Sequence, residues 1–164
     1  MKMANLKDLY VEELRDLYNA EKQLIKALPR MAKAASADQL AAAFEDHLEE
    51  TRGQVERLEA VFRGLKASPG GKKCEAMQGL IAEAESMMRD ADDPDVLDAA
   101  LISAAQRVEH YEIAGYGTVR TYARLLGREG DVTLLQETLD EEGRADKKLT
   151  RLAERVINQR AMSR

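Results

Sequence analysis

Acidic residues occur in this sequence at helix positions where a buried leucine would be expected. In residues 14–28 the apolar side chains recur with helical spacing, and Glu21 lies at the middle of the stripe that they form. Residues 101–119 repeat the pattern, with Glu112 at the centre of the stripe and Glu109 about 60° away, one turn earlier. Each segment is therefore predicted to turn a carboxylate toward the side that it buries.

A third segment, residues 135–156, carries the same anomaly. Glu142 lies at the centre of its apolar stripe, and Asp146 follows one turn later, about 40° away. Glu109 and Glu112 are spaced by three residues and Glu142 and Asp146 by four, so each pair shares one helix face. No lysine or arginine lies on the central stripes near these positions. The carboxylates therefore lack a basic partner of their own.

A fourth segment, residues 40–62, supplies a histidine. Its apolar stripe places His47 and Gln54 about 40° and 60° from the centre, and Glu50 about 100° away at the edge. His47, Glu50 and Gln54 are spaced at i, i+3 and i+7 and form one ridge. Carboxylate, imidazole and amide groups are the donors of a metal site, and Glu50 has the most marginal position of the three.

Several buried carboxylates need something to balance their charge. They can retain protons, bind multivalent cations, or face solvent or a polar interface. Four helices that present such groups at a similar depth favour cations, and carboxylates with few imidazoles suit iron or manganese better than zinc. The Glu-x-x-His pair of many di-iron bundles does not occur in this sequence. The predicted metal ligands are Glu21, His47, Glu50, Glu109, Glu112, Glu142 and Asp146.

Other side chains near these positions have supporting roles in the prediction. Gln54 and Asp146 are assigned to either the first or the second shell of the metals. Tyr18 and Tyr116 lie on inward stripes, where we expect core packing with the hydroxyl bonded to a carboxylate; a redox-active or proton-donating tyrosine is the alternative. His110 points about 160° from Glu112 and is expected to lie outside the site.

The elements that position these residues are five predicted helices. Four are long, at about 5–35, 36–65, 95–126 and 132–157, and a short one at about 75–89 lies between the second and the third long helix. Breaks occur at KASPGGKK, DADDPD and GREGD, and residues 158–164 are expected to fray. The pattern predicts an all-α, ferritin-like four-helix bundle with a short additional helix in the central crossover; a simple up-down bundle with a decorated loop is the alternative.

Composition limits the classes of protein to consider. The 164 residues fit a single domain, and 10 glycines and 3 prolines are too few for a turn-rich sheet protein. A net charge of −5 argues against nucleic acid as a partner, and no run of 18 apolar residues or signal peptide is seen. With one cysteine, Cys74, no intrachain disulfide can form, which suits the cytoplasm and a structural thiol.

The sequence resembles the YciE/YciF family of ferritin-like bacterial stress proteins. The matching stretches are LKDLYVEELRDLYNAEKQLIKALPRMA, HLEETRGQVERLE, KCEAMQGLIAEAE, AQRVEHYEIAGYGTVRTYA and TLDEEGRADKKLTRLA. The resemblance implies a ferritin-like bundle with two iron ions, manganese being the alternative, and a cytoplasmic homodimer that acts in a stress response. It implies the ligands Glu21, His47, Glu50, Glu109, Glu112 and Glu142.

The sequence leaves three functions open. The site could carry out redox chemistry on peroxide, O₂ or Fe(II), as a peroxidase, catalase or ferroxidase does, with two metals bridged by carboxylates. It could instead bind iron without turnover. The acidic stripes could also form the dimer interface of a structural bundle. Metal titration under anaerobic conditions followed by an oxidant separates the three.

Overall fold

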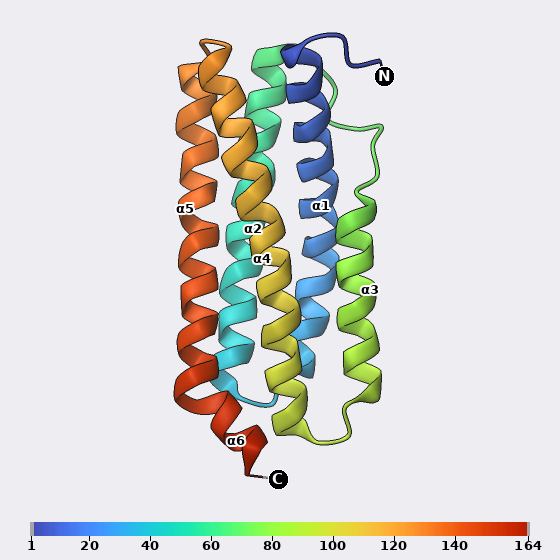
Figure 1. Ribbon diagram of the computed structural model, residues 1–164, viewed down its shortest axis with the longest axis vertical. Helices are drawn as coiled ribbons and strands as arrows, with labels where there is room; N and C mark the ends of the chain where they lie inside the picture. Colours follow the sequence, from blue (N-terminus) through green and yellow to red (C-terminus); the bar gives the residue numbers. More distant parts are fainter. Residues whose placement is uncertain (1, 164) are drawn as a thin grey trace.

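The computed structural model describes residues 2–163, and every regular element in this range is a helix. The helices follow one another in the order shown in Figure 1. They are α1 (Leu6–Ala34), α2 (Asp38–Leu65), α3 (Glu75–Asp90), α4 (Pro94–Leu125), α5 (Glu129–Leu152), the π-helical turn η1 (Ala153–Ile157) and α6 (Asn158–Met162). The five predicted helices are therefore all present.

The four long helices form a bundle of two antiparallel hairpins, α1–α2 and α4–α5. Helix α1 packs against α2 and α4, and α5 packs against α4 and α2, so α1 and α5 are diagonally opposite. Figure 1 shows that α2 and α4 run in the same direction, because the chain returns along the bundle through α3 between them. Helix α3 packs outside the bundle against α4 and α1. One long crossover is the connectivity of ferritin-like bundles, so the simple up-down alternative is wrong.

Short-range signals set the start of α4, whereas a long-range contact sets the start of α2. Asp93 caps α4 by accepting hydrogen bonds from the backbone N–H groups of Asp95 and Val96, and Pro94 follows at the first helical position. Helix α2 begins after Ala37 without a side-chain hydrogen bond at its cap. The buried Asp98 of α4 instead accepts from the N–H groups of Ser36 and Ala37, both at 2.8 Å.

Helix α5 begins earlier than the GREGD sequence predicts. The turn needs only the positive φ of Gly127 (69°), and Glu129 already starts the helix. Asp131 in the first turn accepts hydrogen bonds from the side chains of Arg128 and Tyr10, and its charge favours the helix N-terminus. These contacts stabilise the beginning of α5 at Glu129, although the glycines of GREGD disfavour a helix there.

The C-terminal end of the chain is helical where fraying was expected. The π-helical turn after Leu152 leads into α6, which ends at Met162. Ala153 and Ile157 are buried in this region and pack on the apolar core. Because these two buried residues hold the chain against the core just before residue 158, the helix continues through residues 158–162.

Two apolar clusters fill the bundle, one in each half. The first cluster lies toward the α6 end and includes Leu24, Leu28, Phe44, Leu101 and Leu149. The second lies toward the opposite end and includes Tyr10, Leu14, Leu58, Phe62 and Leu135. Along each helix, the carboxylates singled out in the sequence fall between the members of these two clusters. Apolar layers therefore enclose the site from both sides.

A close approach of α1 to α4 depends on Gly115. A Cβ at this position would lie 2.6 Å from Cδ2 and 3.4 Å from Cγ of the buried Leu17, whereas a Cβ at Gly117 would meet no atom within 4 Å. We expect Gly117→Ala to stabilise the helix by about 0.5–1 kcal/mol. Gly115→Ala should be less stable than Gly117→Ala by about 1–3 kcal/mol, because Leu17 must leave its packed rotamer.

Urea unfolding of the two alanine variants measures this difference. Because both glycines lie in the same helix two residues apart, the change in helix propensity is matched. Equal free energies of unfolding for the two variants would contradict the close approach.

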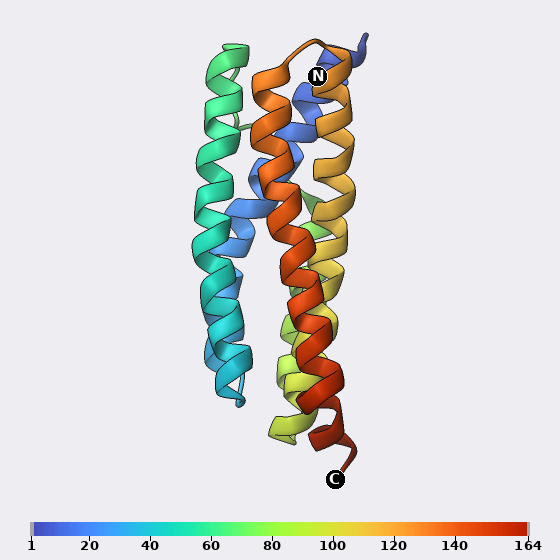
Figure 2. The same ribbon diagram turned by 90° about the vertical axis from the view of Figure 1, so that its left-hand side faces the viewer.

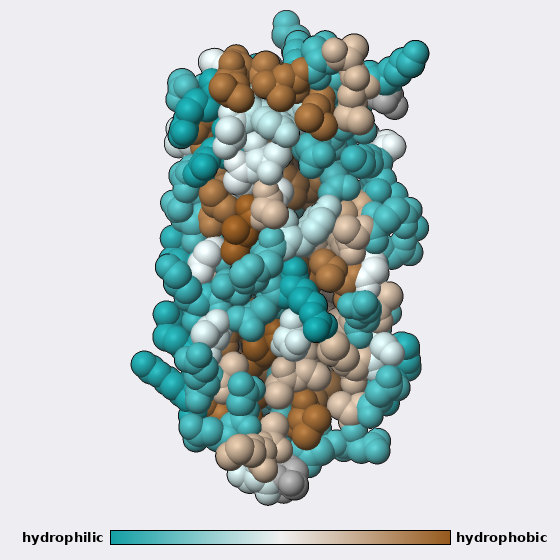
Figure 3. Space-filling view, viewed as in Figure 1, coloured by the Kyte–Doolittle hydropathy of each residue, from teal (hydrophilic) through white to brown (hydrophobic). Residues whose placement is uncertain are grey.

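The visible surface of the bundle is largely hydrophilic. In Figure 3 the hydrophobic residues of this face gather at the upper end and in smaller groups between the helices. None of the helices within residues 2–163 combines the length and the apolar character needed to cross a bilayer.

Candidate metal centre

All four long helices bring a potential metal ligand to one level of the bundle. Helix α4 contributes two carboxylates spaced by three residues, and each other helix contributes one group from its inward stripe. All five side chains are buried. They are Glu21 of α1, His47 of α2, Glu109 and Glu112 of α4, and Glu142 of α5.

The histidine lies among the carboxylates of α4 and α5. Its Nε2 atom lies 3.0 Å from Oε1 of Glu109 and 3.9 Å from Oε2 of Glu142. One donor atom from each of His47, Glu109, Glu112 and Glu142 lies within 4.8 Å of the others. This four-residue cluster has the ligand types and the spacing to hold a metal ion.

Glu21 adjoins the cluster from α1. The hydroxyl of Tyr116 donates a hydrogen bond of 2.5 Å to Oε1 of Glu21, which fixes that carboxyl group. The charge of Glu21 acts on Glu112, its neighbour on α4. Glu112 is therefore subject to the negative charge of Glu21 as well as to that of Glu109 and Glu142.

The cluster leaves several buried oxygens without a hydrogen-bond partner. Both carboxylate oxygens of Glu112 lack one, as does one oxygen each of Glu21, Glu109 and Glu142. Buried polar atoms are nearly always satisfied in folded proteins, so a group of such atoms at one place calls for an explanation. Metal ions would bind these oxygens and balance their charge, so the donor set fits a site for hard cations.

Burial and mutual repulsion raise the pKa values of three carboxyl groups. Burial raises the pKa of Glu21 to about 7. Burial, reinforced by the neighbouring carboxylates, also raises the pKa values of Glu112 and Glu142 well above the ordinary value. Without a metal, these groups therefore keep their protons to a higher pH than an ordinary glutamate does.

His47 and Glu109 form the charged pair of the cluster. Burial by itself would lower the pKa of His47, but the carboxylates of Glu109, Glu50 and Glu142 together outweigh it and raise this pKa well above its usual value. Burial likewise opposes ionisation of Glu109, and His47 nevertheless lowers the pKa of this carboxyl group. In the absence of metal, an imidazolium ion therefore supplies part of the positive charge that the cluster needs.

Besides Glu21, two predicted ligands, Glu50 and Asp146, lie outside the four-residue cluster. Oε2 of Glu50 lies 3.4 Å from Nδ1 of His47, on the opposite side of the ring from Glu109, and its side chain is 39% exposed. Asp146 lies 3.2 Å from Nε2 of His110 and accepts a hydrogen bond from the amide of Gln106. Both contacts turn the Asp146 side chain toward α4, and its assignment as a metal ligand stays a prediction.

Of the residues predicted to support the site, Gln54 and Tyr116 contact its carboxylates and Tyr18 does not. Gln54 lies at the site, where its amide donates to Glu142 at 2.5 Å and to Glu141 at 3.0 Å. Tyr116 bonds Glu21 as expected for a core tyrosine. Tyr18, by contrast, donates to Glu59 and packs edge-on against Phe62, so the structure does not bring it to the cluster.

A charged pair that was not predicted from the sequence supports the site. Arg57 donates two hydrogen bonds to Glu141, at 2.6 and 2.8 Å, and Glu141 in turn accepts from Gln54. This chain of contacts holds the amide that bonds Glu142. A signal was present, since Arg57 follows Gln54 by three residues on one face and Glu141 precedes Glu142 directly.

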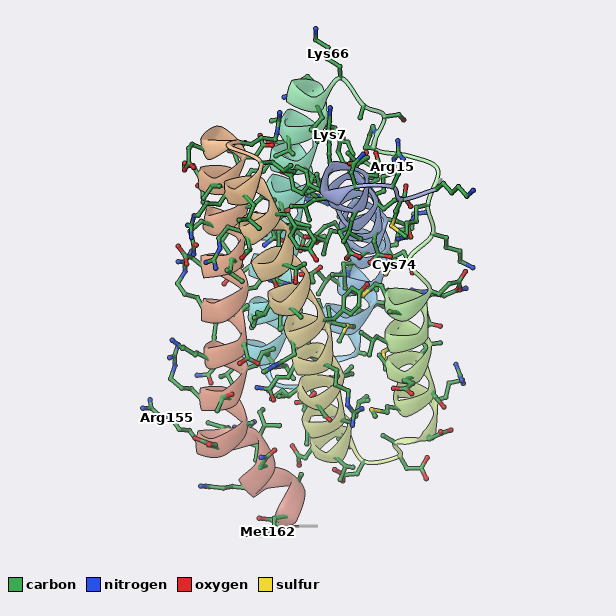
Figure 4. All side chains as sticks on the ribbon, turned by 45° about the horizontal axis from the view of Figure 1, so that its top comes forward. Lys7, Arg15, Lys66, Cys74, Arg155 and Met162 are labelled. Atoms are coloured by element: carbon green, nitrogen blue, oxygen red, sulfur yellow. The ribbon has the colours of Figure 1, made fainter. Side chains whose placement is uncertain are left out.

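The single cysteine lies away from the cluster, at the start of α3 beside α1 (Figure 4). The Cys74 sulfur accepts a hydrogen bond from the N–H of Met77 and contacts the Tyr111 hydroxyl at 3.1 Å and Asp16 at 3.2 Å. Burial raises the pKa of this thiol. These contacts agree with the predicted structural role, because Cys74 caps a helix and joins it to the bundle.

Comparison with known proteins assigns the family. The family described as domain of unknown function DUF892 matches residues 5–162. Protein YciF of Escherichia coli K12 is 48% identical over 164 residues, which cover 98% of each chain. The chain belongs to this family. The predicted relationship to YciF is therefore confirmed.

Solved structures in the family share the architecture. The crystal structure of the E. coli stress protein YciF matches with a TM-score of 0.91 at 47% identity, over 95% of this chain and 99% of that one. The Rhodopseudomonas palustris protein YcfI matches with a TM-score of 0.89 at 44% identity, over 91% and 95% of the two chains. The helical bundle is thus a fold that the family shares.

Proposed function

We propose that this chain is a dinuclear metal protein that takes part in a stress response and carries out redox chemistry at the buried carboxylate cluster. The main support is the set of buried carboxylate oxygens without hydrogen-bond partners in Glu21, Glu109, Glu112 and Glu142. Two iron ions are the proposed metals, with manganese as the alternative, because oxygen donors outnumber the single imidazole. The stress role follows the description of YciF, and we propose a cytoplasmic homodimer.

Within the proposed site the residues have distinct tasks. Glu21, His47, Glu109, Glu112 and Glu142 would hold the metals, which when bound supply one-electron steps toward peroxide, O₂ or Fe(II) as substrate. Tyr116 orients Glu21 through its hydroxyl, and the Gln54 amide orients Glu142. The apolar clusters on both sides of the site limit access of water to the carboxylates from the two ends of the bundle.

Anaerobic titration with Fe(II), followed by air or hydrogen peroxide, tests this function. We expect about two Fe(II) ions to bind each chain, since the four ionised carboxylates Glu21, Glu109, Glu112 and Glu142 can balance their charge. Addition of the oxidant should then change the absorption spectrum, and fresh Fe(II) or reductant should allow repeated cycles. Stoichiometric binding without cycles would indicate a protein that only sequesters iron. Absence of stoichiometric binding would contradict the metal site itself.

A further inference from the structure

A pocket of about 340 Å³ lies inside the bundle next to the candidate metal centre. All four long helices line it, and its inner end reaches His47 and Glu109. Residues of α2 and α5 line its outer part; Figure 2 looks onto the side of the bundle where these two helices run antiparallel. The volume falls in the range of small-molecule sites, at about 300–1,000 Å³.

The walls of the pocket are apolar. Leu24 and Leu28 of α1, Phe44 of α2, Val108 of α4 and Leu149 of α5 form most of them. These side chains belong to the buried core and can exchange no hydrogen bonds with a ligand. An occupant should therefore present a hydrocarbon surface to this part of the pocket.

Small side chains create the space. Ala43 of α2, Ala105 of α4 and Ala145 of α5 all line the pocket, at positions where a larger residue would fill the bundle. Protein cores are normally packed to the density of organic crystals, so three alanines around one unfilled volume leave room for a ligand. The opening lies between two helices, which suits a thin alkyl chain better than a folded partner.

The rim on α5 is basic. Arg144, Lys147, Lys148 and Arg151 line the pocket, and Lys148 pairs with Asp46 at 3.0 Å. The other three are exposed, and the charge of Arg144 also acts on Glu141, one turn earlier on α5. With Asp46 and Glu50 as the acidic residues of the outer part, the basic residues are in excess there. The rim thus complements a ligand with one negative charge.

We propose that this pocket binds a medium-chain aliphatic carboxylate, with the alkyl chain between the helices and the carboxylate at the basic rim of α5. The alkyl end then lies toward His47 and Glu109. This binding uses apolar contact and the rim charges, so it does not require a bound metal. It adds a ligand class to the proposed redox function, and it can be tested independently of that function.

Calorimetric titration of the full chain with octanoate and with 1-octanol tests the proposal. We expect saturable binding of octanoate at one site and affinity for 1-octanol that is about fivefold weaker. The double variant Arg144→Gln/Arg151→Gln should lower the affinity for octanoate to that for 1-octanol and leave the alcohol unaffected. Equal affinities of the wild-type chain for the acid and the alcohol would overturn the assignment of the carboxylate.

Filling the pocket provides the second arm. Ala43→Leu should weaken octanoate binding about tenfold or more, because its side chain takes the volume of the ligand, and Ala145→Leu serves if the first variant does not fold. Ala114→Leu, at an exposed position of α4, is the matched control and should bind as the wild type does. Metal content is measured in parallel. Absence of saturable binding, or unchanged binding by a folded filled variant, would overturn the proposal whatever the metal content.

Discussion

The Glu142→Ala variant is expected to retain at most half of the metal that the wild-type protein binds. Glu142 has one oxygen held by Gln54 and a second without a partner, close to His47 and the α4 carboxylates. Removing the side chain takes away a central ligand and leaves an imidazole and two carboxylates around the gap. Glu112→Ala should have the same effect, since neither of its oxygens has another partner.

Metal analysis by mass spectrometry of purified, metal-loaded protein measures this loss. His110→Ala is the matched control, because its imidazole lies outside the cluster with a side chain that is 68% exposed. This variant should keep its metal nearly intact. Glu142→Gln separates loss of charge from loss of volume and should also bind less metal. Normal metal content in Glu142→Ala, or a loss in His110→Ala, would show that the ligands have been assigned to the wrong residues.

The stability of the metal-free protein is expected to fall as pH rises from about 5 to 8. Burial raises the pKa of Glu21 from 4.5 to about 7, and the pKa values of Glu112 and Glu142 are raised as well. A raised pKa means that the folded state holds its proton more tightly than the unfolded state does. The resulting stabilisation is complete below the unfolded pKa and is lost as pH passes the folded one. For Glu21 alone it is on the order of 3 kcal/mol.

His47 acts in the same direction within this window. Its pKa is raised above 6.5, so its contribution is also present at low pH and lost as pH rises. The lowered pKa values of Glu109 and Glu141 act in the opposite direction, but their contributions are lost only as pH falls below about 4.5. Between pH 5 and 8 the change in stability therefore comes from the groups with raised pKa values and not from Glu109 or Glu141.

Urea unfolding of metal-free and Mn(II)-loaded protein across this window measures the effect. Metal binding displaces protons, so the gain in stability on adding Mn(II) should increase with pH. Glu21→Gln should reduce the pH dependence of the metal-free protein, because the amide cannot titrate. Identical stabilities with and without excess metal at pH 8, or a metal-free protein that becomes more stable as pH rises, would contradict this account.

The centre of the site could be predicted from helical periodicity alone. Glu21, Glu112 and Glu142 lie at the middle of their apolar stripes, and a residue at the middle stays buried over a wide range of helix rotations. His47 and Glu109 lie closer to the edge, yet they are buried because they form an ion pair across the bundle. The fold followed from the same stripes together with the break at KASPGGKK and the short helix after it.

Residues at the margins of the stripes could not be placed in this way. Glu50, Asp146 and Tyr18 lie within reach of more than one neighbour, and small rotations of the packed helices decide which neighbour they meet. Asp146 contacts His110 and Tyr18 contacts Glu59, and the assignment of Glu50 and Asp146 as metal ligands remains a prediction. Asp98 caps α2 by accepting hydrogen bonds from Ser36 and Ala37, which precede it in the sequence by 62 and 61 positions. No local pattern reports such contacts.

The most direct test of the metal centre is a crystal structure of protein grown with iron or manganese, with anomalous scattering recorded at the absorption edge of the metal. The account predicts two anomalous peaks inside the bundle, bound by carboxylate oxygens of Glu21, Glu112 and Glu142 and by Nε2 of His47. Crystals that show no anomalous density between Glu21, Glu112 and Glu142, with these carboxylates still in contact inside the bundle, would contradict the metal centre.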